Sequence, residues 1–158
     1  MLTQLKTTTA VAEEVKTKVS HADWAARELK TLRRSKLEDL LQAIHEAEEW
    51  LTKFQDFHLY DRAEPTGSLL PKIERLSGLY FPELKPFTQA YCQLYRAMTV
   101  DVLEASQELI GKGKTLQARL EVDTKFRQSW QPQYGRQLAN IAAIENAANK
   151  LMTDLVGV

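Results

Sequence analysis

The chain has 158 residues, of which 44% are hydrophobic and 27% are charged, a composition typical of a folded protein and unlike that of a disordered one. Its 21 basic and 21 acidic residues balance, which disfavours a dedicated nucleic-acid-binding protein, and its single cysteine, Cys92, excludes an intrachain disulfide. No apolar run reaches the roughly 18 residues that a membrane-spanning helix needs, and the N-terminus lacks the apolar segment of a secretory signal. We therefore expect a cytoplasmic protein without a membrane span, unless an anchor has been removed from a longer chain.

The first long segment predicts one very long helix. No glycine or proline occurs before Pro65, and the apolar residues of this segment recur at helical spacing within an arc of about 140° on one helix face. This stripe consists of Val11, Val15, Val19, Ala22, Ala25, Leu29, Leu32, Leu40, Ile44, Ala47, Leu51 and Phe54. Ser35 and Glu38 match a capping box, which would start a second helix there. The unbroken phase favours a continuous helix over residues 9–58, about 75 Å long, with a break at Ser35 as the alternative.

Glycine and proline mark the main turn region. Of the 6 Gly and 5 Pro residues, six fall between Pro65 and Pro86, and within this region a short helix is predicted over residues 69–77. A second long helix is expected over residues 83–131.

Two glycines and a proline decide how the second long helix ends. Gly111 and Gly113 each cost about 1 kcal/mol inside a helix, so both a continuous helix and a break at residues 111–114 remain open. Pro132 and Gly135 predict its end, and an alanine-rich C-terminal helix should follow over residues 136–156.

The fold class predicted from these segments is all-α. No segment alternates apolar and polar residues for long enough to suggest a sheet. We therefore expect one domain spanning residues 1–158, an elongated antiparallel hairpin or bundle of three to four helices packed like a coiled coil. In the simplest assembly the two long helices pair in antiparallel. The core is then expected to contain Leu40, Ile44, Leu51, Phe54, Tyr91, Leu94, Met98 and Val102.

Motifs for catalysis or cofactor binding are not found. Residues 111–115 read Gly-Lys-Gly-Lys-Thr and match the end of a phosphate-binding P-loop, but Glu108 stands where that loop needs its first glycine. The residues three positions before His21, His45 and His58 are Lys18, Gln42 and Gln55, so the Glu-x-x-His pairs of a di-iron bundle are missing. We expect no catalytic, cofactor-binding or metal-binding residues, no cofactor and no enzymatic activity.

Aromatic residues near the turn region have two interpretations. They form a small core that closes the end of the hairpin, or Tyr60, Tyr80 and Phe81 form a docking surface for a partner protein.

The charge pattern of the first helix indicates self-association. Residues 27–36 contain five basic side chains and one acidic one, whereas residues 38–49 contain five acidic side chains and no lysine or arginine. Two such helices crossing in antiparallel near Leu37 would place basic against acidic residues twice, as a two-fold interface requires. The predicted self-association residues are Arg27, Lys30, Arg33, Arg34, Leu37, Glu38, Asp39 and Leu41.

These observations favour a non-catalytic helical interaction or scaffold protein that binds protein partners and forms a homo-oligomer. The alternative is an accessory protein that binds nucleic acid or another anionic surface. Its basic belt would combine Arg27, Lys30, Arg33, Arg34 and Lys36 with Lys112, Lys114 and Arg119, which the antiparallel assembly places at the same level.

Overall fold

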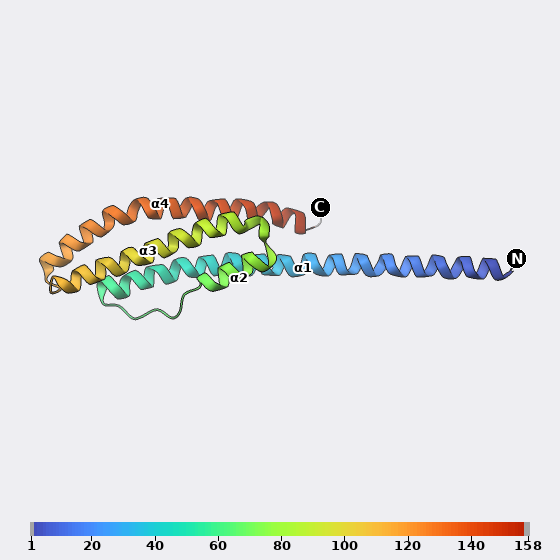
Figure 1. Ribbon diagram of the computed structural model, residues 1–158, viewed down its shortest axis with the longest axis horizontal. Coiled ribbons are helices and arrows are strands. Elements are labelled where there is room, and N and C mark those ends of the chain that lie inside the picture. The colour runs from blue at the N-terminus through green and yellow to red at the C-terminus, as the bar shows by residue number, and fades with distance from the viewer. Residues whose placement is uncertain (1, 157–158) are drawn as a thin grey trace.

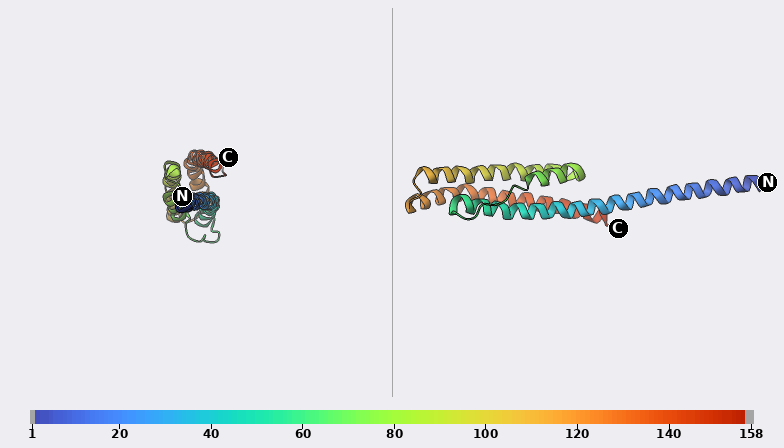
Figure 2. Two further views of the ribbon diagram at one scale, coloured as in Figure 1. Left: turned by 90° about the vertical axis from the view of Figure 1, so that its right-hand side faces the viewer. Right: turned by 90° about the horizontal axis from the view of Figure 1, so that it is seen from below.

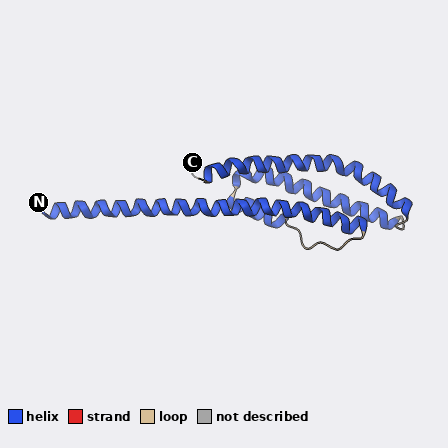
Figure 3. Cartoon of the chain, turned by 180° about the vertical axis from the view of Figure 1, so that it is seen from behind, coloured by secondary structure: helices blue, strands red, loops and turns tan. Residues whose placement is uncertain are grey.

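The computed structural model describes the backbone of residues 2–156 and the side chains of residues 8–156. Four α-helices and one short 3-10 helix follow each other along the chain: α1 (Leu2–Tyr60), α2 (Leu70–Tyr80), η1 (Pro82–Leu84), α3 (Lys85–Gly111) and α4 (Leu116–Leu155). Residues 2–156 contain no strand (Figure 3). The predicted all-α class and the bundle architecture are confirmed.

The first helix is continuous, as the phase of its apolar stripe predicts. α1 spans 59 residues and passes through Ser35 without a break, so the capping-box alternative is wrong. Strong helix formers surround Ser35 on both sides, and a single serine inside such a helix costs only about 0.5 kcal/mol.

The direction of the helices differs from the prediction. α1 and α3 run in the same direction, and α2 and α4 run in the opposite one (Figure 1). The hydroxyl of Tyr95 bonds to the backbone carbonyl of Ala47, and further along both helices Leu59 packs in one cluster with Leu109. The expected antiparallel pairing of the first two long helices is therefore wrong.

The segment between α1 and α3 explains this parallel arrangement. Residues 61–69 form a loop that leads back along α1, and α2 continues in the same direction for 11 residues (Figure 1). An extended loop of this length reaches about 30 Å and α2 adds about 16 Å. That is enough to return the chain along the part of α1 that lies in the bundle, so α3 starts beside the middle of α1.

The antiparallel hairpin of this fold is formed by α3 and α4. The chain reverses at residues 112–115, where Gly113 has φ 80°, Lys114 has φ 54°, and the hydroxyl of Thr115 accepts a 3.1 Å bond from the N–H of Ala118. Left-handed backbone ends one helix and a threonine cap starts the next. Of the two alternatives for residues 111–114, the structure has the break.

The predicted helix boundary at Pro132 is wrong, because α4 passes through both Pro132 and Gly135. A proline removes one N–H donor from a helix but does not remove its apolar contacts. The Gln133 amide donates to the Ser129 carbonyl and to the Asp101 carboxylate of α3, so neighbouring side chains hold the helix at this point. α4 arches along its length rather than ending (Figure 1).

The buried residues agree with the predicted core, although the direction of α3 relative to α1 differs from the prediction. Leu40, Ile44, Leu51, Tyr91, Met98 and Val102 are buried, whereas Phe54 and Leu94 are half-buried and pack against the core clusters. None of the helices within residues 2–156 combines the length and apolarity that crossing a membrane requires.

Candidate interaction surface

The N-terminal half of α1 extends beyond the bundle as a single helix (Figures 1 and 2). Every side chain from Thr8 to Leu32 is exposed, whereas Leu37 is completely buried. We call residues 8–32 of α1 the arm. Its polar contacts include Lys18 with Glu14 at 3.3 Å and Arg27 with Asp23 at 3.4 Å, pairs four residues apart on the same helix that leave the apolar stripe uncovered.

The stripe that faces the core inside the bundle continues along the arm without cover. Leu40 is 0% exposed, but Leu29 is 58% exposed and Val19 is 63% exposed. Val11, Val15 and Leu32 are exposed as well. Fully burying a side chain of this kind contributes about 1.5–3 kcal/mol relative to full exposure, and these half-exposed side chains forgo part of that free energy. The arm is thus an extended apolar surface on a helix with no neighbour from its own chain.

A cluster of contacts fixes the base of the arm to the bundle. The Arg33 guanidinium donates to the Tyr80 carbonyl at 3.2 Å, pairs with the Glu83 carboxylate and lies 5.4 Å from the ring centre of Phe81. The Lys36 ammonium lies 5.6 Å from the ring centre of Tyr80. These contacts tie α1 to the corner between α2 and α3, so the direction of the arm is set by the bundle.

The predicted self-association residues are divided between the interior and the surface. Leu37 is buried in the core, Leu41 is half-buried and Arg33 is engaged at the base of the arm, so these three are occupied within one chain. The exposed members are Arg27, Lys30, Arg34, Glu38 and Asp39. Arg34 pairs with Glu38 at 3.6 Å, and Lys36 pairs with Asp39 at 3.9 Å. The opposed charge blocks therefore partly neutralise each other along one helix.

The predicted docking aromatics do not form one surface. Tyr60 lies at the end of α1 where the α3–α4 hairpin closes, and its hydroxyl donates a 2.8 Å bond to Asp123. Tyr80 and Phe81 lie beside Arg33, and Phe81 is 0% exposed. The two locations are separated by the length of α1 between residues 33 and 60, about 40 Å. The aromatics thus belong to two ends of the bundle, and buried Phe81 is not available to a partner.

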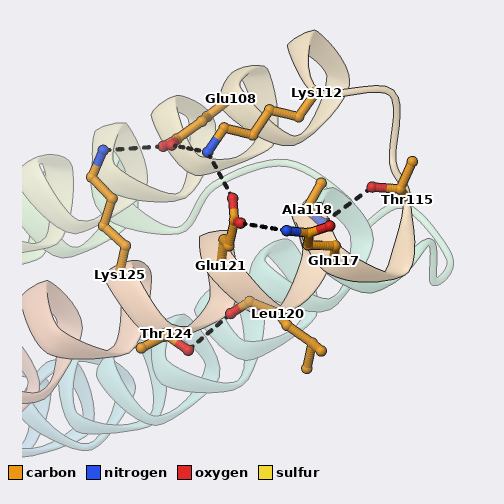
Figure 4. Close-up of polar contacts among 9 residues, drawn as sticks. All are labelled: Glu108, Lys112, Thr115, Gln117, Ala118, Leu120, Glu121, Thr124 and Lys125. Atoms are coloured by element: carbon orange, nitrogen blue, oxygen red, sulfur yellow. Dashed lines mark hydrogen bonds and ion pairs between the residues drawn. The ribbon is translucent and has the colours of Figure 1, made fainter.

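The basic belt is not formed. Lys112 and Lys114 lie at the closed end of the bundle, about 36 Å from the basic block at residues 27–36, because α3 runs parallel to α1. Lys112 pairs with Glu108 at 3.1 Å and with Glu121 at 3.5 Å (Figure 4). Arg119 and Lys114 pair with Asp61 at 3.0 Å and 3.3 Å and hold the pKa of its carboxyl below the ordinary value. The predicted alignment of the two basic groups is therefore wrong.

Two open cavities of several hundred Å³ lie along α1 within the bundle. The larger, about 890 Å³, is open and lies between α1 and residues 62–69, with the Trp50 indole donating to the Thr66 carbonyl across it. The other, about 450 Å³, is a groove between α1 and α4 lined by Leu41, Ile44, His45, Glu48, Ile141, Ile144, Glu145 and Asn149. Residues 8–156 contain no cluster of three His, Cys, Asp or Glu side chains suited to a metal ion.

The exposed apolar surface of α1 thus lies further toward the N-terminus than the interaction surface predicted around Leu37. The signal for it was the apolar stripe itself, which continues for seven helical turns before the first buried position. Comparisons with protein-family models, with curated proteins and with solved structures found no match to this chain.

Proposed function

We propose that this protein is a non-catalytic interaction protein whose working surface is the arm, and that the arm binds an amphipathic helix. The proposal rests on one observation, the exposed apolar stripe on a helix that its own bundle leaves uncovered. Most helical stability in proteins comes from packing an apolar face, and the arm lacks such packing within its own chain. A partner that packs on the stripe would supply that stability.

The chemistry of the stripe selects the partner. Valine, leucine and alanine at helical spacing form a surface of knobs and shallow holes that fits another helix. Charged residues such as Lys16 and Asp23 flank the stripe on the arm. A partner helix with an apolar face and polar edges satisfies both features. The bundle then serves as the rigid base that positions the arm, as a scaffold would.

Site-specific photo-cross-linking in the native host tests this proposal. A benzophenone amino acid is placed at Ala22, which lies on the stripe, and separately at Trp24, which is 64% exposed and lies about 200° further around the helix. Both positions are on the arm, so neither substitution disturbs the core. We expect a covalent adduct with a protein chain from position 22 and none, or far less, from position 24.

Equal yields at the two positions would contradict the proposal, because a docking face must distinguish the two sides of the arm. Absence of any adduct at position 22 would contradict it as well. The mass of an adduct identifies the partner as another copy of the chain or as a different protein.

A further inference from the structure

We propose that the helix that covers the arm is the arm of a second copy, docked in antiparallel with its centre between Ser20 and His21. This inference rests on the proposed function, since it names the partner of the same surface. In this dimer the two arms overlap along about 37 Å and the two bundles lie at opposite ends. Three features of the arm support this arrangement over the alternatives.

The first feature is the size of the side chains along one line of the arm. Six exposed residues follow the alternating spacing of three and four that is typical of a helix–helix seam, four of them in the stripe (Val15, Val19, Ala22 and Leu29) and two beside it (Ala12 and Ala26). In the antiparallel register the seam pairs Ala12 with Leu29, Val15 with Ala26, and Val19 with Ala22 of the other copy. Every large side chain then meets a small one, which packs without voids.

A parallel dimer packs the same residues less well. Each residue would face its own copy, so Leu29 would meet Leu29 and Ala22 would meet Ala22. The layers of two valines or two leucines would hold the helices apart, and the layers of two alanines between and beside them would leave space. The order of large and small residues in the arm therefore favours the antiparallel alignment.

The second feature is the charge beside the seam. On one edge of the antiparallel pair, Lys16 of each copy lies beside Asp23 of the other. Along the helix axis the two residues are offset by about 3 Å, which the long lysine side chain can span. Asp23 also lies 3.4 Å from Arg27 of its own chain, so it joins a basic residue from each copy. On the other edge, Val11 lies near Leu32 and extends the apolar contact.

The third feature is the basic block at the base of the arm. Residues 27–36 carry five basic side chains and one acidic one. A parallel dimer would place the two blocks side by side, and like charges directly opposite each other destabilise an interface. The antiparallel dimer separates their centres by about 33 Å, well beyond the screening length of about 8 Å at physiological salt.

Distances between spin labels on the full-length protein test the arrangement. Two variants in a Cys92→Ala background carry one cysteine each, Ser20→Cys or Ser35→Cys, and circular dichroism confirms that each is folded. Ser20 and Ser35 are both exposed on α1 and off the stripe. In the antiparallel dimer the labels at position 20 should lie within about 20 Å of each other, and those at position 35 about 45 Å apart.

Other results would overturn the inference. Short distances at both positions would mean a parallel dimer. A distance of about 50 Å at position 20 with a short one at position 35 would mean that the helices cross at Leu37 instead. No dipolar coupling at either position, at high protein concentration, would mean that no second copy binds there. In that case a cross-link from position 22 to a different protein would leave the proposed function intact while this inference fails.

Discussion

The hydroxyl of Tyr91 on α3 donates a 2.7 Å hydrogen bond to Oε1 of Glu48 on α1. Tyr91 is fully buried and Glu48 is half-buried beside the groove between α1 and α4. Burial raises the pKa of Glu48 above the ordinary value of 4.5, and the hydrogen bond from Tyr91 acts in the opposite direction with a smaller effect. A carboxylate at this position therefore joins two core helices at an electrostatic cost.

Replacing Glu48 with glutamine should change how stability depends on pH. Because its pKa is raised in the folded state, Glu48 binds a proton more tightly in the folded protein than in the unfolded one. Its contribution to the free energy of unfolding must then fall as pH rises from about 4.5 through the folded-state pKa. Glu48→Gln keeps an oxygen that accepts the Tyr91 hydroxyl but cannot ionise, so the variant should gain stability relative to the natural protein as pH rises. Urea unfolding between about pH 4 and pH 7 measures this difference, and a constant difference or the reverse trend would contradict it.

Two leucine-to-alanine substitutions in the same helix should have very different costs. Leu40 is 0% exposed, so Leu40→Ala should reduce the free energy of unfolding by about 2–5 kcal/mol through lost burial and a cavity. Leu29 is 58% exposed on the arm, and Leu29→Ala should change the stability of the dilute bundle by less than about 0.5 kcal/mol. Chemical denaturation at low protein concentration measures both. Equal costs would mean that the arm is packed against its own bundle.

Two glycine-to-alanine substitutions should have effects of opposite sign. A Cβ at Gly135 would meet nothing within 4 Å, and the residue lies inside α4, so Gly135→Ala should stabilise the protein by about 0.5–1 kcal/mol. Gly113 has φ +80° in the turn between α3 and α4, where an alanine is strained, so Gly113→Ala should destabilise it by about 1 kcal/mol. Thermal unfolding of both variants checks this, and a stabilising Gly113→Ala would contradict the turn geometry.

Helical phase predicted α1 and the core well, because it depends on local spacing alone. The positions of Leu40, Ile44 and Leu51 in the core follow from a period that any covering helix would satisfy. The direction of α3 is not a property of phase. It depends on whether residues 61–84 lead the chain back along α1 before α3 begins. The apolar patterns of α1 and α3 are compatible with either direction.

Two features in the second half of the chain, the break at residues 112–115 and the continuous helix at Pro132, depend on local contacts. The spacing of apolar residues does not reveal such contacts. Lys114 takes a left-handed conformation and Thr115 caps α4, so the chain breaks although the stripe continues across the turn. Pro132 fails to break α4 because Gln133 holds the helix to Asp101. Thr115 as a helix cap was the signal present in the sequence, since threonine is a favoured residue at that position.

The extension of the arm beyond the bundle is related to the boundaries of α1 and α3. Once the break lies at residues 112–115, α3 has 27 residues and cannot cover an α1 of 59 residues. The part of α1 from residue 33 to residue 60 is about as long as α3, and the exposed residues 8–32 extend beyond it. The lengths of α1 and α3 are therefore consistent with a partly uncovered stripe. The partner that covers the stripe is inferred from the side chains of the arm.

The mass of the protein in solution tests most directly whether the arm is an association surface. The chain has a mass of 18.1 kDa, and light scattering at high protein concentration should give about twice that value. A Val15→Lys, Val19→Lys double variant should return to the mass of one chain, because both lysines lie on the stripe. A control with the same added charge on the outer face, Thr17→Lys with Ser20→Lys, should keep the mass of two chains. A mass of one chain for the natural protein, or equal masses for the two variants, would contradict the account.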